Sequence, residues 1–169
     1  MRIRLILCAG ALAAASCAVA GCTSGGAAAA PAAGAEAKRA TIPVRIASSN
    51  GAHDFQVEVA ATVDQQAQGL MFRTDIPADG GMIFTPYPAD GGPPREASFW
   101  MKNTPSPLDI IFVRSDGTIA HIAENTVPFS ETPVMSGEPV AAVLEIRGGR
   151  SAELGIAEGD RVSWPRARR

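Results

Sequence analysis

Cysteine, histidine and long apolar segments are scarce in this chain of 169 residues. All three cysteines lie at or before position 22, and the only histidines are His53 and His121. From Thr23 onward the chain therefore offers no thiol for a disulfide, a metal site or a nucleophile. Neither a Gly-x-Ser-x-Gly motif nor a phosphate-binding glycine loop occurs. These absences predict no metal and no cofactor, and they favour a protein that is not an enzyme.

Basic side chains are in the minority. The chain has 15 basic and 17 acidic residues, a net charge of −2, and loss of Arg2 and Arg4 with residues 1–21 would leave 13 against 17. A nucleic-acid-binding surface needs a basic face, so no nucleic-acid partner is predicted. The one basic cluster is the tail at 166–169, which we interpret as solvated, the alternative being contact with anionic lipid headgroups.

What is present begins with an export signal at 1–21. Two arginines precede an apolar run over 5–19 that is too short to span a bilayer comfortably. The sequence Val-Ala-Gly-Cys at 19–22 resembles a bacterial lipobox, which implies cleavage before Cys22 and a diacylglyceryl thioether on its sulfur. The alternative is an ordinary secretory signal that happens to contain a cysteine.

A lipidated Cys22 would anchor the chain without a transmembrane helix. Thr23 occupies the position where aspartate would be a retention signal for the inner membrane, so we expect the outer membrane, with the protein facing the periplasm. Residues 22–40 are rich in alanine and glycine and lack large apolar side chains, which predicts a flexible tether. As a random coil, about 18 residues would reach roughly 25 Å. A single β domain is expected over 41–165.

The pattern of the domain is mostly that of short strands separated by turns. It predicts an all-β fold with one or two short helices, either a compact antiparallel β-sandwich or a partly open β-barrel. The expected strands cover 42–46, 55–59, 81–84, 98–103, 108–114, 118–123, 140–147 and 161–164, and the proline-rich stretch at 85–97 is expected to be a loop.

Local signals indicate where some elements begin. Asn50-Gly51 between two alternating runs predicts a β-hairpin. Thr62 and Gln65 fit a capping box, and the helix they open is expected to place Val63, Ala67, Leu70 and Met71 on one face. A short helical turn is expected over 151–155.

The densest motif is the segment Phe-Trp-Met-Lys-Asn-Thr-Pro-Ser-Pro-Leu-Asp-Ile-Ile-Phe at 99–112. A period of two would put Phe99 and Met101 on one face and Trp100 and Lys102 on the other. With the motifs at 69–73, 81–84, 144–146 and 159–160, this segment closely resembles the bacterial and archaeal family called domain of unknown function 192. The resemblance implies a compact all-β domain, usually exported, with no established activity.

Charged residues inside the motifs are the candidate site residues. Asp109, Glu145 and Arg73 could form a structural ion pair or capped carboxylate that holds a hairpin. Alternatively, Arg73, Trp100, Asn103, Thr104 and Asp109 could line a cleft for a polar ligand. A third hypothesis pairs Asp109 with Glu145 for glycoside hydrolysis. Trp100 could be an exposed platform for a sugar ring or peptide, or it could complete the core.

These observations favour a membrane-anchored periplasmic lipoprotein, a bacterial member of the family, that binds or assists at the cell envelope without catalysis. Its expected partners are the membrane, through the lipid, and an envelope glycan, peptidoglycan or a protein. The alternative is a small hydrolase or transferase in which Asp109 or Glu145 acts as acid or base. A purely structural accessory module is the third possibility.

Overall fold

The computed structural model describes residues 40–165. The predicted signal peptide, Cys22, the tether up to residue 39 and the basic tail at 166–169 lie outside the described residues. No helix within the described range is long and apolar enough to cross a bilayer.

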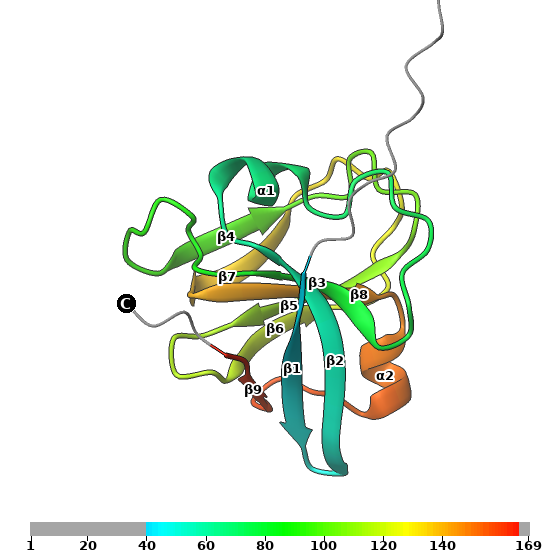
Figure 1. Cartoon of the computed structure of the whole chain (residues 1–169), viewed down its shortest axis with the longest axis vertical. Helices are drawn as coiled ribbons and strands as arrows, with labels where there is room; N and C mark the ends of the chain where they lie inside the picture. Colours follow the sequence, from blue (N-terminus) through cyan, green and yellow to red (C-terminus); the bar gives the residue numbers. More distant parts are fainter. Residues whose placement is uncertain (1–39, 166–169) are drawn as a thin grey trace, which may run out of the picture. The chain divides into compact units, whose positions relative to one another are not determined.

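One strongly curved sheet contains most of the strands (Figure 1). In chain order they are β1 (Thr41–Ser48), β2 (Gly51–Ala60), β3 (Gly80–Phe84), β5 (Leu108–Val113), β6 (Ile119–Ala123), β8 (Ala142–Arg147) and β9 (Arg161–Ser163). Across the sheet they follow the order β6-β5-β8-β3-β2-β1-β9, antiparallel except for the parallel pair β2–β3. A bridge between Thr118 and Arg161 brings the two edges together, so the sheet is a nearly closed barrel.

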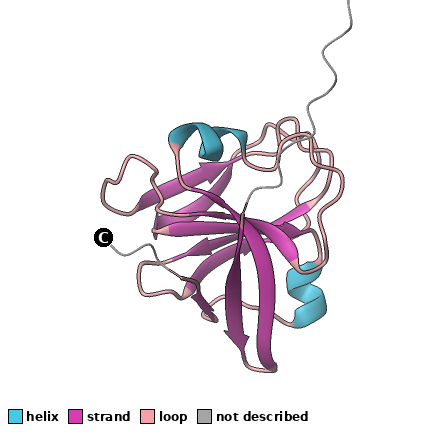
Figure 2. Ribbon diagram, viewed as in Figure 1, coloured by secondary structure: helices cyan, strands magenta, loops and turns pink. Residues whose placement is uncertain are grey.

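A second, two-stranded antiparallel sheet consists of β4 (Arg95–Phe99) and β7 (Val134–Val140). Two short helices complete the fold, α1 (Val63–Gln68) and α2 (Arg150–Leu154). Figure 2 shows α1 beside the small sheet and α2 at the opposite side of the strands.

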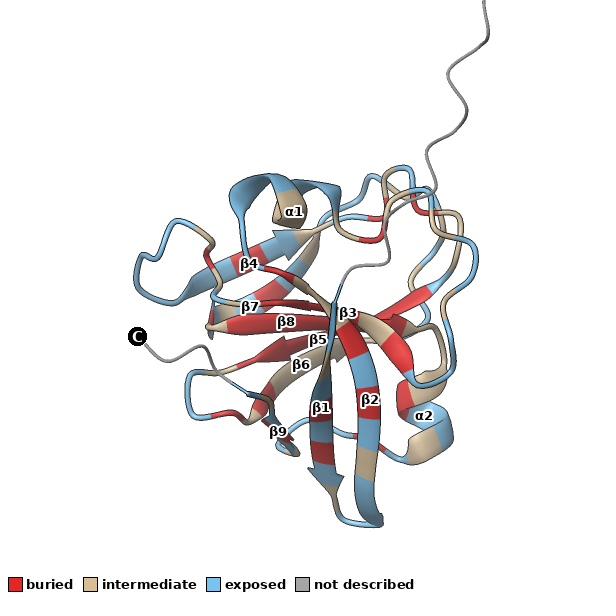
Figure 3. Ribbon diagram, viewed as in Figure 1, coloured by how far each residue is buried: buried red, intermediate tan, exposed pale blue. Residues whose placement is uncertain are grey.

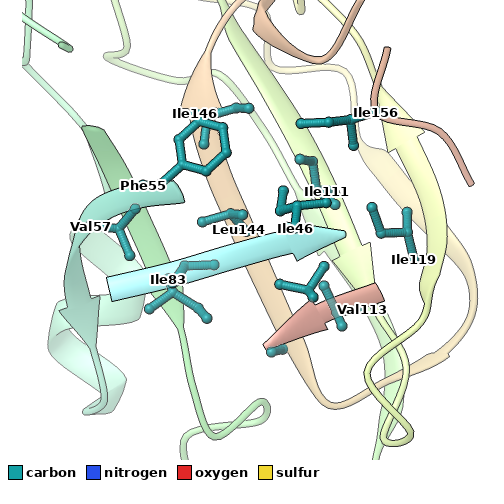
Figure 4. Packing of buried hydrophobic residues seen from close by; sticks show 13 residues of the cluster. Ile46, Phe55, Val57, Ile83, Ile111, Val113, Ile119, Leu144, Ile146 and Ile156 are labelled. Atoms are coloured by element: carbon teal, nitrogen blue, oxygen red, sulfur yellow. The ribbon is translucent and has the colours of Figure 1, made fainter. Parts of the chain in front are cut away.

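The buried apolar residues form two clusters, one on each face of the large sheet. Inside the barrel, Phe55, Ile83, Ile111 and Leu144 belong to the first cluster (Figure 4). The second cluster includes Phe84, Phe112, Val143 and residues of the small sheet. The strands β5 and β8 are therefore buried on both faces, which explains their continuous apolar sequences (Figure 3).

Along β8, successive side chains alternate between these clusters. Leu144 and Ile146 point into the barrel, whereas Val143 belongs to the outer cluster. Glu145 shares the face of Val143 because side chains two residues apart on a strand project to the same side. The fold thus places one carboxyl group on the apolar face between the large sheet and the small sheet.

The expected all-β architecture is confirmed, with nine strands and two short helices in the described residues. The hairpin between β1 and β2 also forms, with Ser48 paired to Gly51. Thr62 caps α1 through the predicted capping box, in which its side chain accepts from the Gln65 amide at 3.2 Å.

Some predicted elements were wrong. The strand expected over 98–103 is β4 at 95–99, so it starts within the predicted proline-rich loop and ends before Trp100. The expected strand over 140–147 is divided at residue 141, and β7 was not predicted because Pro139 and Gly137 interrupt its apolar pattern. The helix α1 ends at Gln68 and has no buried residue, so its expected apolar face does not exist.

Candidate functional site

A pocket of about 330 Å³ lies between α1, β4 and the outer face of the large sheet. Gln66 and Gln68 come from α1, and Gly69 and Leu70 follow it directly. The remaining walls come from the end of β3 and the loop after it, from β4, and from β8. They include Phe84, Tyr87, Ser98, Phe99, Trp100, Thr104 and Glu145.

Glu145 is the most unusual of these residues. It is only 4% exposed, and its Oε2 atom is buried without a hydrogen-bond partner in the described part of the chain. Its neighbours across the sheet are Met82 on β3 and Ile110 on β5, which supply no compensating charge. Burial raises the pKa of Glu145 from 4.5 to about 8, so the carboxyl group is largely protonated at neutral pH.

Two glycines allow other chain segments to approach Glu145 closely. A Cβ atom on Gly81 would lie 2.1 Å from the backbone oxygen of Glu145, so only glycine lets β3 pair with β8 at this level. Gly69 ends α1 with φ of 51° and ψ of −134°. Its Cβ atom would lie 3.2 Å from the Phe84 ring and 3.8 Å from Glu145 Oε2. Gly69 therefore shapes the pocket beside the Glu145 carboxyl group, and Gly81 allows the backbone pairing of β3 with β8.

Aromatic rings form much of the pocket wall. Phe84 and Phe99 make an edge-to-face contact with centroids 5.0 Å apart, and Tyr87 lies 6.0 Å from Phe99. At the rim, Trp100 is 47% exposed and Lys102 Nζ lies 5.1 Å from its ring centroid. Of the two alternatives for Trp100, the structure has the exposed one, and Met101 on the other side of the chain is buried.

Hydrogen bonds from side chains and backbone hold these walls in place. Gln66 Nε2 donates to the backbone oxygens of Ala60, at 3.0 Å, and Pro86, at 2.8 Å. The Tyr87 amide donates to the Ala141 oxygen at 3.0 Å. These contacts connect α1, the loop after β3 and the segment between β7 and β8, so the pocket is built on fixed elements.

Asp109 has a different environment. Its Oδ1 accepts the amides of Asn125, at 2.7 Å, and Gly149, at 2.8 Å, and its Oδ2 accepts the amide of Ser151 at 2.7 Å. The fully buried carboxylate thus fixes the start of α2 and the turn after β6. This geometry corresponds to the capped-carboxylate alternative.

Asp109 and Glu145 cannot form a catalytic pair on one face. Ile110 lies opposite Glu145 in the register of β5 and β8. Because neighbouring residues on a strand point to opposite faces, the Asp109 side chain projects away from the face of Glu145. The sheet therefore separates the two carboxyl groups.

Arg73 and Asn103 also lie outside the pocket lining. Arg73 Nη1 pairs with Glu58 Oε1 at 2.9 Å, and its Nε lies 3.6 Å from Asp75. Asn103 has a positive φ of 55°, and its backbone oxygen accepts the Phe72 amide at 2.8 Å. Of the predicted candidates, Trp100, Thr104 and Glu145 share one pocket. Arg73, Asn103 and Asp109 lie outside it, and Asp109 holds backbone amides on the other side of the sheet.

Both histidines take part in surface contacts. His121 Nδ1 lies 2.7 Å from Glu158 Oε1 and its ring stacks on Phe112, whereas His53 contacts Ser48 and Asn50. Within residues 40–165, no three acidic, histidine or cysteine side chains are arranged to hold a metal ion.

The sequence reasoning missed Gln66, Tyr87, Ser98 and Phe99 as pocket residues. Nothing in their local sequence indicates a shared site, because strand order brings them together. Only the glycines next to the motif residues could have suggested a close approach of chain segments.

The fold and its pocket define a small β-barrel domain, and comparison with known proteins identifies its family. The model of the DUF192 family, described as "Uncharacterized ACR", matches residues 45–164. The chain therefore belongs to this family.

Two solved structures are similar to it. One is a protein of unknown function from Novosphingobium aromaticivorans, with 47% identity and a TM-score of 0.71 over 81% of this chain and 94% of that one. The other is described as a candidate transcription regulator from Sinorhizobium meliloti, with 44% identity and a TM-score of 0.69 over 75% of this chain and 95% of that one. No protein with curated annotation matches the chain.

Proposed function

We propose that this protein is a lipid-anchored envelope protein whose β domain binds a small ligand in the pocket above Glu145. The observation that carries the binding role is the buried Oε2 atom of Glu145, which lacks a partner and belongs to a residue that lines the pocket. An unsatisfied buried polar atom costs about 1–3 kcal/mol, and a ligand that donates a hydrogen bond would remove this cost.

The form of the pocket supports a small ligand. Its volume of about 330 Å³ is at the lower end of the range for sites that enclose small molecules. Its aromatic walls offer apolar contact, and Trp100 extends this surface to the rim. Small ligands released from envelope glycan or peptidoglycan, or a side chain of a partner protein, fit this role.

The anchoring part of the proposal rests on the sequence. A lipid on Cys22 would hold the domain at the periplasmic side of the outer membrane, and residues 22–40 would act as its tether. A nucleic-acid-binding role, such as the description of one similar structure as a transcription regulator would imply, is disfavoured because the predicted mature chain has 13 basic residues against 17 acidic ones.

Binding is tested by NMR spectra of the protein with muropeptides and with N-acetylglucosamine. The expected result is a set of shifts confined to pocket residues. Trp100→Ala should weaken the effect, while Val127→Ala is the control, because its side chain is also exposed, 69%, and does not line the pocket. If both variants weaken binding equally, or if the shifts map elsewhere, the pocket is not the site.

Anchoring requires a separate experiment. Mass spectrometry of the protein from its native membranes should show a mature chain that begins at a lipidated Cys22. Cys22→Ser should move the protein out of the membrane fraction. An unmodified thiol at Cys22 would contradict the anchor and leave the binding proposal untouched.

A second candidate function uses Glu145 as a general acid or base. It is favoured by the raised pKa of about 8, since a group that titrates near the working pH transfers protons efficiently. Asp109 does not suit this role because backbone amides occupy both of its oxygens. A Glu145→Gln variant that still binds ligand but loses turnover would establish the enzyme.

A further inference from the structure

The charge of the pocket lining restricts the ligand more closely than its size does. Among the lining residues, Glu145 is the only acid, and none is lysine, arginine or histidine. An anionic ligand would meet no cation in the lining and would face the Glu145 carboxyl group. The lining therefore disfavours anions, and a choice remains between neutral and cationic ligands.

Two polar groups of the lining already donate to backbone oxygens. The Gln66 amide nitrogen already donates to two backbone oxygens. The Thr104 hydroxyl donates to the Lys102 oxygen at 3.2 Å. The buried polar atom that the lining leaves unsatisfied is Glu145 Oε2, so a ligand should direct a polar group at this carboxyl group and apolar carbon at the aromatic walls.

Aromatic rings and a carboxyl group together form the arrangement that attracts an ammonium ion. The faces of Tyr87, Phe99 and Trp100 carry the negative part of the ring quadrupole. Lys102 Nζ, 5.1 Å from the Trp100 centroid, shows that a cation is already drawn to one of these rings. Once Glu145 is ionised, its unpartnered Oε2 atom can only accept, so it requires an N–H or O–H donor, which a quaternary ammonium lacks.

We propose that the pocket binds a primary or secondary organic amine in its ammonium form, with an N–H directed at Glu145 and the carbon skeleton against Tyr87, Phe99 and Trp100. This inference rests on the proposed ligand-binding function and specifies its chemical class. It also gives a role to the carboxyl group at this apolar position of β8.

Binding of an ammonium ion changes the protonation of Glu145. In the empty pocket the pKa of Glu145 is about 8, so binding of an ammonium ion at lower pH requires the carboxyl group to release its proton. Amines of this kind stay charged because they titrate near about pH 10. Affinity should therefore rise about tenfold for each pH unit up to about pH 8 and then level off.

Other charged groups nearby are already engaged with one another. Glu58 on β2, which is separated from Glu145 by Met82, pairs with Arg73 at 2.9 Å. At the rim, Lys102 lies 3.7 Å from Glu131. The residues packed directly around Glu145, which are Met82, Ile110, Gly69 and Phe84, do not titrate, so the pH profile reports on Glu145.

Three probes of the same shape and different charge provide the test: benzylamine, benzyl alcohol and benzoate. Their affinities for the complete protein are measured by NMR titration at about pH 8. We expect benzylamine to bind at least tenfold more tightly than the alcohol, and benzoate not to bind. Glu145→Gln, which keeps the side-chain size, should abolish the preference, whereas the exposed Glu153→Gln control should retain it.

The outcomes separate the two proposals. Equal or tighter binding of benzyl alcohol or benzoate at pocket residues would overturn the amine inference and preserve the ligand-binding function. Absence of pocket shifts with these probes and with muropeptides would overturn both. If Glu145→Gln fails to fold, the wild-type profile decides, because an affinity for benzylamine that does not change between about pH 6 and about pH 8 contradicts the inference.

Discussion

Burial of Glu145 makes the stability of the domain depend on pH in a direction opposite to that of an ordinary salt-bridged carboxylate. The pKa of Glu145 is raised to about 8 in the folded protein, from 4.5 for the free side chain. At a pH between these two pKa values, the carboxyl group of Glu145 has lost its proton in the unfolded chain and keeps it in the folded chain. The folded state thus binds more protons, and the free energy of unfolding falls as pH rises.

The size of the effect follows from the two pKa values. Each unit of difference corresponds to about 1.4 kcal/mol, so stability should fall by roughly 5 kcal/mol from about pH 4.5 to about pH 8. At about pH 7 the cost is roughly 3 kcal/mol. Burial of Glu145 costs no stability below about pH 4.5, where the carboxyl group is protonated in both the folded and the unfolded chain. The cost stops growing above about pH 8, where the group is ionised in both.

Urea unfolding of the wild-type protein and of Glu145→Gln at a series of pH values isolates this contribution. Other carboxylates titrate in both proteins, so the difference between the two curves belongs to Glu145. Glu145→Gln should match the wild type near about pH 4.5 and exceed it by roughly 3 kcal/mol near about pH 7. A constant difference across this range would show that Glu145 does not titrate as its burial requires.

Three further predictions concern backbone contacts of Asp109, Gly81 and Thr62. Asp109→Asn replaces an acceptor with a donor facing backbone amides, so denaturant unfolding should show a loss of about 2–3 kcal/mol; an unchanged midpoint would contradict the capping role. Gly81→Ala places a methyl group 2.1 Å from the Glu145 backbone oxygen and should cost about 3 kcal/mol or prevent folding, which soluble yield and thermal melting would reveal. Thr62→Ala removes the cap of α1 and should lower stability by about 1 kcal/mol, whereas Thr62→Ser should not; equal melting of all three proteins would argue against the cap.

Local sequence predicted the elements that depend on neighbours along the chain. The β1–β2 hairpin follows from alternation and turn residues, and the start of α1 follows from the Thr62 cap. By contrast, β7 contains Gly137 and Pro139, which weaken any strand signal, and it forms because β4 offers a partner. Such pairing is a property of the folded chain.

In the candidate site, too, local sequence predicted some features and tertiary pairing determined the others. Trp100, Thr104 and Glu145 were recognisable because their motifs concentrate polar and aromatic residues among apolar ones. Their separation from Asp109 depends on the register of β5 against β8, which the sequence does not reveal. The partner of Arg73, Glu58, lies on β2 and becomes its neighbour only through the tertiary fold.

The position of β9 has a consequence for assembly of the molecule. β1 pairs on one side with β2, its immediate successor, and on the other side with β9, the last strand. During synthesis, one edge of β1 stays unpaired until residues more than a hundred positions later have been added to the chain. During that interval its open hydrogen-bonding groups are available to other chains, a situation that promotes aggregation. Loss of the last strand should therefore harm solubility out of proportion to its three residues.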